Sequence, residues 1–161
     1  MTPETAIELF KDHKWMSSAL GIMARYPQTR YESLGIPTWL YGHEPSTPLA
    51  THIAKFFENS VREDVILSIA VGGIIYTPGS AGTLQEIFQD AEQNHYLSMG
   101  VSSPMIFLDK HFWTEEVPVY SLIKHLLQKG KYQNLQLTLT DDMNEVETVL
   151  KEFQKNHQAN N

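Results

Sequence analysis

The stretch GGIIYTPGSAGTLQEIFQDAEQNHY, residues 72–96, decides the expected fold of this 161-residue chain. It opens with an apolar strand candidate at 72–78, a pattern typical of a strand buried in a parallel sheet. The small-residue turn GSAG follows, and the segment 83–96 then has the periodicity of a helix. A strand, turn and helix in this order predict an α/β protein in which helices connect parallel strands.

The same alternation extends outward from this stretch in both directions. Towards the C-terminus we expect strands and helices at 104–109, 117–130, 135–141 and 142–153. Asp142 and Glu145, at the start of the last helix, have the spacing of a capping box. Towards the N-terminus the patterns predict helices at 3–14 and 49–70, a short helical or irregular stretch at 17–26, and a strand at 36–42. We therefore expect one α/β domain over 1–161, a three-layer sandwich with a mainly parallel sheet covered by helices on both faces.

The composition excludes several classes of protein. Apolar residues make up 42% of the chain and charged residues 19%, which indicates a globular protein rather than a disordered one. The formal net charge of −7 disfavours general nucleic-acid or membrane-surface binding, and the absence of Cys excludes disulfides and thiolate metal sites. The longest apolar run, 65–76, is too short to span a bilayer, and the N-terminus lacks a signal-peptide core. A cytoplasmic protein is expected.

The turn after the strand at 72–78 has the chemistry of an anion-binding site. Small residues let the backbone approach a ligand closely, and the amide groups at a helix N-terminus favour a negative charge. Two hydroxyl groups add donors to these amides. The candidate phosphate-binding residues are Pro78, Gly79, Ser80, Ala81, Gly82 and Thr83.

Glu86 follows Thr83 by three residues and admits two interpretations. An acid in the first turn of a helix can cap a free amide and interact favourably with the helix dipole. Alternatively, the carboxylate can address the sugar attached to a phosphate bound in the turn. Spacing alone does not separate these interpretations.

The string PGSAGTLQE resembles the PGGxGTxxE signature of the LONELY GUY (LOG) family, Rossmann-like nucleoside-monophosphate phosphoribohydrolases. Ser80 replaces the second Gly of that signature, and the similarity covers about residues 20–155. Of the family's first Gly-rich element only ALGIM, residues 19–23, is recognisable, so we expect a chain that is N-terminally short relative to the family. The residues that match the signature are Pro78, Gly79, Gly82, Thr83 and Glu86.

The resemblance implies hydrolysis of the N-glycosidic bond of a nucleoside 5′-monophosphate to free base and ribose 5-phosphate. It also implies a homodimer that needs no metal and no cofactor. Glu86 would stabilise the oxocarbenium-like transition state or orient the water, and Arg62 would assist it. The alternative for Arg62 is a surface ion pair with Glu58 or with a neighbouring acid.

Further candidates lie outside the motif. Tyr41, Gly42 and His43 follow the strand predicted at 36–42, which makes them a possible base pocket or an ordinary Pro-bounded turn. The seven His residues lack metal-ligand spacing, and His95 suits the C-terminal end of its helix. Two other functions stay open: a non-catalytic nucleotide-binding or carrier protein, and a purely structural partner subunit.

Overall fold

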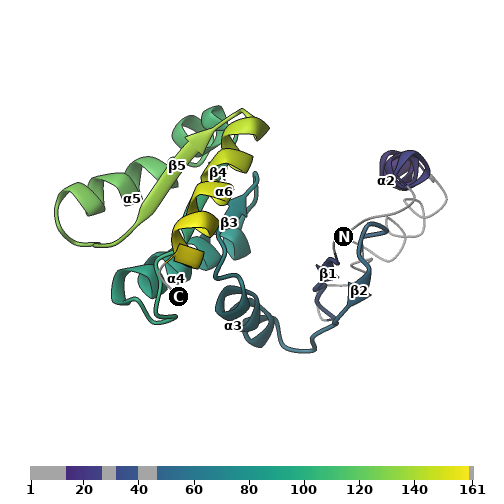
Figure 1. The fold of residues 1–161 in the computed structure, drawn as a ribbon, viewed down its shortest axis with the longest axis horizontal. Helices are drawn as coiled ribbons and strands as arrows, with labels where there is room; N and C mark the ends of the chain where they lie inside the picture. Colours follow the sequence, from purple (N-terminus) through teal and green to yellow (C-terminus); the bar gives the residue numbers. More distant parts are fainter. Residues whose placement is uncertain (1–13, 27–31, 40–46, 160–161) are drawn as a thin grey trace. The chain divides into compact units, whose positions relative to one another are not determined.

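The computed structural model describes residues 14–26, 32–39 and 47–159, which Figure 1 draws in colour. The chain divides into two compact units, Met1–Ile66 and Leu67–Asn161, called here the N-terminal and C-terminal units. Each unit is described by itself, so the single domain expected from the sequence stays a prediction. Among the described residues, no helix combines the length and the apolar character needed to cross a membrane.

The C-terminal unit contains a three-stranded sheet with the order β3–β4–β5. Its strands are β3 (Ile74–Tyr76), β4 (Pro104–Leu108) and β5 (Gln136–Thr140). Both pairs of strands are parallel, and Tyr76 at the end of β3 pairs with Phe107 near the end of β4. The carboxyl ends of all three strands therefore lie at one edge of the sheet.

Helical segments connect and follow these strands. Helix α4 (Ala81–Tyr96) joins β3 to β4, and helix α6 (Met143–Ala159) follows β5. Between β4 and β5 the chain forms a short π-helix, η1 (Phe112–Glu116), and then α5 (Val119–Gln128). The π-helix was not predicted from the sequence.

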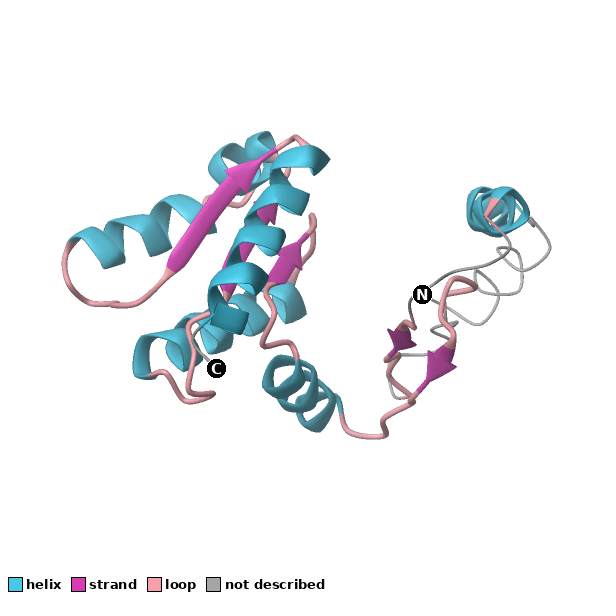
Figure 2. Ribbon diagram, in the orientation of Figure 1, coloured by secondary structure: helices cyan, strands magenta, loops and turns pink. Residues whose placement is uncertain are grey.

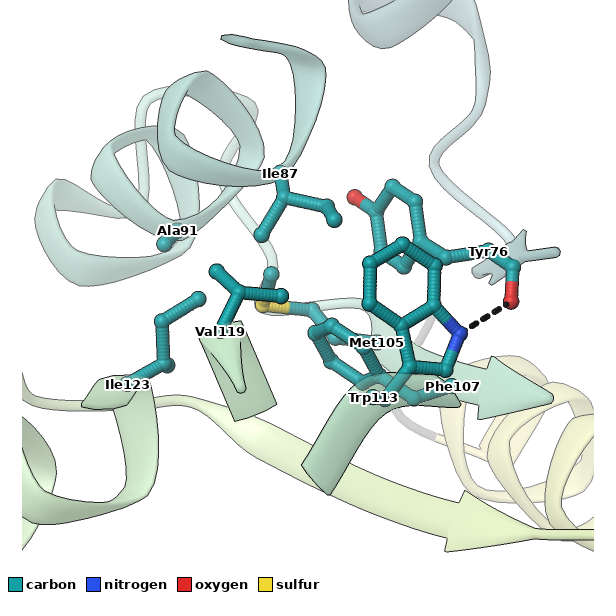
Figure 3. Close-up of a cluster of buried hydrophobic side chains, with 8 residues drawn as sticks. All are labelled: Tyr76, Ile87, Ala91, Met105, Phe107, Trp113, Val119 and Ile123. Carbon is teal, nitrogen blue, oxygen red and sulfur yellow. Dashed lines mark hydrogen bonds between the residues drawn. The ribbon is translucent and has the colours of Figure 1, made fainter. Parts of the chain in front are cut away.

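The main core lies between the sheet and helices α4 and α5 (Figure 3). Met105 and Phe107 of β4 are both completely buried on this face. Successive residues of a strand point to opposite faces, so Ile106, also completely buried, faces the other side. The cluster consists of Tyr76, Ile87, Ala91, Met105, Phe107, Trp113, Val119 and Ile123.

Helix α6 covers the opposite face of the sheet, where it contacts β4 and β5 (Figure 2). Its Val146 is 2% exposed. A Cβ at Gly73 would lie 2.7 Å from Cδ2 of Leu150, and the backbone there has a φ of +127°, so only glycine fits. Helices thus lie on both faces of a parallel sheet, which confirms the predicted α/β fold class.

Trp113 links the carboxyl ends of two strands. Its indole Nε1–H donates to the carbonyl oxygens of Leu108 (3.0 Å) and Tyr76 (3.3 Å), the last residues of β4 and β3. Figure 3 shows the bond to Tyr76 beside the rings of the core. Because the side chain is also completely buried, it fixes the edge of the sheet from which the turn at 77–80 leaves.

In the N-terminal unit the structure describes one complete helix, α2 (Lys14–Arg25), which confirms the helical alternative for 17–26. Two-residue strands β1 (Leu34–Gly35) and β2 (His52–Ile53) pair in parallel. The helix α3 (Asn59–Ile69) begins in this unit and ends in the C-terminal one. The helix predicted at 3–14 lies almost entirely outside the described residues.

The helix predicted at 49–70 is wrong in its first half, because α3 starts only at Asn59. The hydroxyl of Thr51 accepts a hydrogen bond from the Ser33 amide (2.7 Å) and donates to the Ser33 carbonyl (2.9 Å). The hydroxyl of Ser33 also donates to the carbonyl of Leu49 at 2.9 Å. Such side-chain bonds compete with helical hydrogen bonds, and they hold this segment extended beside β1.

The strand predicted at 36–42 is also incorrect as a continuous element. Strand pairing is found in β1, which ends before residue 36, and at a single parallel bridge between Thr38 and Phe56. Pro37 lies between these two points and has no amide to donate, which interrupts the ladder. Residues 40–46 lie outside the described part of the chain.

The capping box predicted at Asp142 and Glu145 takes a different form. The Asp142 carboxylate accepts from the amide of Asn144 at 2.9 Å. Glu145 instead accepts from the hydroxyl of Thr140 (2.5 Å), which itself accepts from the Asp142 amide (2.9 Å). The cap therefore includes the last residue of β5, and α6 continues to Ala159, six residues beyond the predicted end.

Candidate functional site

The turn after β3 leads directly into the N-terminus of α4. Ser80 is the N-cap residue, and its carbonyl accepts from the amide of Leu84 at 3.0 Å. The Ser80 hydroxyl forms no capping hydrogen bond. The first amides of a helix have no partner within the helix, so an N-terminus without a side-chain cap can donate to an anion.

Gly79 is in close contact with Thr83. A Cβ at position 79 would lie 2.8 Å from the Thr83 Cβ and still closer to its hydroxyl, so a larger residue would displace that side chain. Ser80, where the family signature has glycine, has a φ of −121°, which any residue adopts without strain. The departure from the signature therefore leaves the backbone of the turn unstrained. Pro78, Ser80, Ala81 and Gly82 are exposed, and Thr83 is half-buried.

Glu86 is half-buried and lies in the second turn of α4, because the helix starts two residues earlier than predicted. No acidic residue occupies the first turn. The dipole interaction weakens beyond the first turn, and a capping box would need its acid at Thr83, so the capping interpretation of Glu86 is incorrect. The chemical interpretation stays a prediction.

A buried polar network lies next to Glu86. The Tyr76 hydroxyl donates to the Asp90 carboxylate at 2.6 Å, and the Asn94 amide donates to its other oxygen at 3.1 Å. Asn94 in turn accepts from the backbone amide of Ser103 at 2.7 Å. The network ties the end of β3 and the segment before β4 to the same face of α4.

The pKa values of Asp90 and Tyr76 in this network differ from their usual values. Burial raises the pKa of Asp90 to about 6, although the hydrogen bond from Tyr76 lowers it. Burial and the neighbouring charges of Asp90 and Glu86 raise the pKa of Tyr76 well above its usual range. The sequence analysis did not identify the hydrogen bonds of Asp90 with Tyr76 and Asn94. The signal for them is that Asp90 and Asn94 are polar residues four apart on an otherwise apolar face of the helix.

An open cleft of about 350 Å³ lies at the carboxyl edge of the sheet beside the turn. Asp109 accepts from the amide of Phe112 at 2.9 Å, and Asp141 accepts from the amide of Lys110 at 2.8 Å. Each bond uses one carboxylate oxygen. The sequence analysis did not identify this cleft. Its signal is that Asp109 directly follows β4 and Asp141 directly follows β5, so both lie at the carboxyl edge of the sheet. The lining residues are Pro78, Leu108, Asp109, Asp141 and Met143.

Arg62 lies on α3 in the N-terminal unit. Its Nε donates to the Asn59 side-chain oxygen at 2.9 Å, and its Nη1 donates to the carbonyl of Ile36 at 3.3 Å. Its Nη2 lies 3.9 Å from the carboxylate of Glu63. The predicted ion pair with Glu58 or a neighbouring acid is therefore confirmed for the neighbouring acid, Glu63, although this partner is buried and does not lie at the surface. The structure describes the units of Arg62 and Glu86 separately.

The remaining candidates divide into two groups. Tyr41, Gly42 and His43 lie outside the described residues, so the base pocket stays a prediction. His95 accepts from the amide of Gln133 at 3.0 Å through Nδ1, which makes it a structural anchor for the turn before β5. Over the described residues, no three His, Asp or Glu side chains are grouped so that they could hold a metal ion.

No protein-family model matches the chain, and no curated protein matches it. The resemblance to the LOG family therefore rests on the motif residues at 78–86, and the family's properties enter only as a proposal.

Proposed function

We propose that this protein binds nucleoside 5′-monophosphates and hydrolyses their N-glycosidic bond to free base and ribose 5-phosphate. The observation that carries the proposal is the segment 78–83, which consists of the turn after β3 and the first residues of α4. Most of it is exposed at the carboxyl edge of a parallel sheet, Gly79 packs tightly against Thr83, and the helix has no side-chain cap at its N-terminus. Ligands of open α/β sheets bind at this edge.

The 5′-phosphate is bound by the first amides of α4 with the hydroxyls of Ser80 and Thr83. This local arrangement explains how a chain with a net charge of −7 binds an anion. The Asp109 and Asp141 carboxylates disfavour the phosphate in the neighbouring cleft. They therefore direct it to the helix N-terminus and leave the cleft to uncharged parts of the ligand.

The reaction adds one water across the bond between C1′ and the base. Positive charge develops at the ribose ring as that bond breaks, and the Glu86 carboxylate stabilises it or orients the attacking water. The water oxygen bonds to C1′, and its proton goes to the departing base. The resemblance to the LOG family assigns Arg62 the role of holding the base or Glu86 in place.

The test is release of ribose 5-phosphate from a panel of nucleoside monophosphates by the purified protein. We expect release by the wild type and a loss of at least about 100-fold in kcat for Glu86→Gln, as for other groups that stabilise a transition-state charge. The matched control is Glu92→Gln, an exposed position on the same helix. Release that persists unchanged in Glu86→Gln would contradict the assigned role of Glu86.

A second candidate is a non-catalytic nucleotide-binding or carrier protein. One observation favours this candidate: the turn and its cleft lie wholly within the unit Leu67–Asn161, whereas the proposed catalytic residue Arg62 belongs to the unit Met1–Ile66. Calorimetric binding of a nucleotide without any release of ribose 5-phosphate would support this candidate over the enzyme.

The proposal also includes a homodimer and a cytoplasmic location, as the resemblance and the composition suggest. Light scattering of the purified protein measures the first, and fractionation of the source cells measures the second.

A further inference from the structure

The Asp90 carboxylate belongs to a series of hydrogen bonds whose direction is set at one end. The backbone amide of Ser103 donates to the side-chain oxygen of Asn94 at 2.7 Å. Because a backbone amide can only donate, the oxygen of Asn94 faces Ser103 and its nitrogen faces Asp90. This nitrogen donates to Oδ1 of Asp90 at 3.1 Å, so Oδ1 always acts as an acceptor.

The other carboxylate oxygen of Asp90, Oδ2, accepts from the Tyr76 hydroxyl at 2.6 Å. An O–H···O distance of about 2.5–2.7 Å is typical of a hydrogen bond to an ionised carboxylate. When Asp90 binds a proton, that proton has to lie on Oδ2, because Asn94 offers only a donor to Oδ1. Protonation of Asp90 therefore reverses or breaks the bond from Tyr76, and ionisation restores it.

The surroundings of Asp90 make its ionised form depend on these two donors. Asp90, Tyr76 and Asn94 are each nearly completely buried. The cavity beside Asp90 has a volume of about 10 Å³, close to the minimum for one water molecule, so solvent cannot hydrate the carboxylate fully. Burial raises the pKa of Asp90 to about 6, and the hydrogen bond from Tyr76 lowers it.

The charged groups around Asp90 leave this titration to Asp90 itself. Among the described residues that line the cavity, Asp90 is the only titratable one, and the others are apolar or carry uncharged amide or hydroxyl groups. On the side of β3, burial and the charges of Asp90 and Glu86 raise the pKa of Tyr76 well above its usual range. Tyr76 therefore stays a neutral donor while Asp90 gains or loses its proton.

Tyr76 is the last residue of β3, so its position sets where the turn at 77–80 begins. Its carbonyl oxygen accepts from Nε1–H of Trp113 at 3.3 Å, the bond that Figure 3 shows. Its hydroxyl bonds to Asp90 in the third turn of α4, which connects the strand before the turn to the helix after it. Only the second of these two bonds changes when Asp90 binds a proton.

We propose that Asp90 is a pH-dependent positioning residue for the turn at 77–80, because its ionised form holds Tyr76, and with it the start of the turn, against α4. Burial and this hydrogen bond act in opposite directions. Ionisation of the buried Asp90 lowers the free energy of unfolding, yet it strengthens the local bond to Tyr76, since a bond that lowers a pKa is stronger to the ionised group.

The consequence for phosphate binding rests on the proposed function. The turn binds phosphate more tightly when Asp90 is ionised, because its first residue is then held in place. Asp90 lies about 14 Å along α4 from Ala81, more than a Debye length, so its own charge repels the phosphate only weakly.

The first experiment follows the titration of Asp90 by ¹³C NMR of its carboxyl carbon, in the whole protein without ligand. Tyr76→Phe removes the donor and keeps the ring in the core, and the control Tyr96→Phe removes the hydroxyl of a phenol that is 68% exposed on the same helix. We expect the pKa of Asp90 to rise above about 6 in Tyr76→Phe and to stay at about 6 in Tyr96→Phe.

Backbone amide signals of Gly79 and Ser80 provide a second measure in the same samples. We expect them to shift with the midpoint of Asp90 in the wild type and to lose this shift in Tyr76→Phe and in Asp90→Asn. An unchanged or lower pKa of Asp90 in Tyr76→Phe would overturn the inference, and so would turn signals that titrate alike in the wild type and in Tyr76→Phe.

The second experiment measures the affinity for ribose 5-phosphate by calorimetry from one pH unit below the Asp90 midpoint to one unit above it. Because the phosphate itself titrates near pH 6, Asp90→Asn provides the baseline, and Glu92→Gln is the control for loss of an exposed carboxylate from α4. We expect the affinity of the wild type and of Glu92→Gln to rise about 3- to 10-fold more than that of Asp90→Asn, the range expected for one hydrogen bond.

The two experiments separate this inference from the proposed function. An equal rise of affinity in all three proteins would overturn the inference alone. No binding of ribose 5-phosphate at any pH, with a titration of Asp90 that still depends on Tyr76, would overturn the proposed function and support the positioning of the turn by Asp90.

Discussion

The two units of the chain are ordered by different kinds of contact. In the C-terminal unit, strands of three to five residues pack between helices, and Met105, Ile106 and Phe107 are completely buried. In the N-terminal unit, the strands have two residues each, and hydroxyl groups of Ser33 and Thr51 connect them to neighbouring backbone. Burial of apolar surface organises the C-terminal unit, whereas polar side-chain bonds hold the paired segments that the structure describes in the N-terminal unit.

This difference teaches where hydrophobic periodicity is informative. A pattern of apolar residues reports which face of an element is buried, so it predicts elements that owe their position to a core. It carries no information about a Ser or Thr side chain that bonds to a distant backbone group. The predictions below, in order of decreasing effect, test this contrast between the units.

The largest effect is expected for Trp113→Ala. The side chain is completely buried in the core of the C-terminal unit and bonds to the ends of β3 and β4, so its removal should cost about 3–5 kcal/mol of unfolding free energy. The control Trp39→Ala removes an indole that is 56% exposed in the N-terminal unit. Chemical denaturation measures both, and equal losses would refute the contrast between the units.

Asp90→Asn should alter how stability depends on pH. The folded-state pKa of about 6 lies above the ordinary 3.8, so the folded protein binds the proton more tightly than the unfolded chain. The contribution of Asp90 to the free energy of unfolding is fully present below its ordinary pKa. This contribution is lost as the pH rises through about 6, and the loss amounts to at most about 3 kcal/mol.

Denaturation midpoints measured across this pH range provide the test. The decline should flatten in Asp90→Asn and persist in Glu92→Gln, which removes an exposed carboxylate from the same helix. An unchanged slope in Asp90→Asn would show that another group is responsible.

Gly79→Ala should weaken nucleotide binding. The added Cβ would displace Thr83 and the first turn of α4, where each charge-assisted hydrogen bond contributes enough for a loss of about 10- to 100-fold in affinity. Gly72→Ala is the matched control, because a Cβ there meets nothing within 4 Å. Calorimetry with a nucleoside monophosphate decides between them, and similar affinities in the two variants would contradict the assigned role of the turn.

The smallest effect is expected for Thr51→Ala in the N-terminal unit. The hydroxyl makes two exposed hydrogen bonds to Ser33, and their loss should cost about 1 kcal/mol locally. Amide hydrogen exchange at Ser33 should accelerate, while exchange in β4 stays as in the wild type. Exchange that accelerates equally in both places would indicate that the two units unfold together.

Much of the C-terminal unit was predictable because its determinants are local. The strands at 72–78, 104–109 and 135–141 and the helix at 83–96 are confirmed, although each strand is shorter than its apolar run. The error of two residues at the start of α4 nevertheless changed the interpretation of Glu86. A turn of small residues gives no periodic signal for the point at which a helix begins.

The candidate site was predictable only in part. The turn at 78–83 is contiguous in sequence, so its residue types and spacing suffice to identify it. The partners of Arg62 were predictable only in part: the expectation of Glu58 or a neighbouring acid includes Glu63, but it does not include Asn59 or the carbonyl of Ile36. The last of these is 26 residues away.

The sequence by itself therefore determined the alternation of parallel strands and helices in the C-terminal unit and the chemistry of the turn before α4. Both depend on residues adjacent along the chain or repeated at the period of one element. Only the tertiary structure decided that Tyr76 bonds to Asp90, that Asp109 and Asp141 line one cleft, and that Glu63 is buried beside Arg62. These relations depend on how elements pack and in which register the strands pair, which no local pattern specifies.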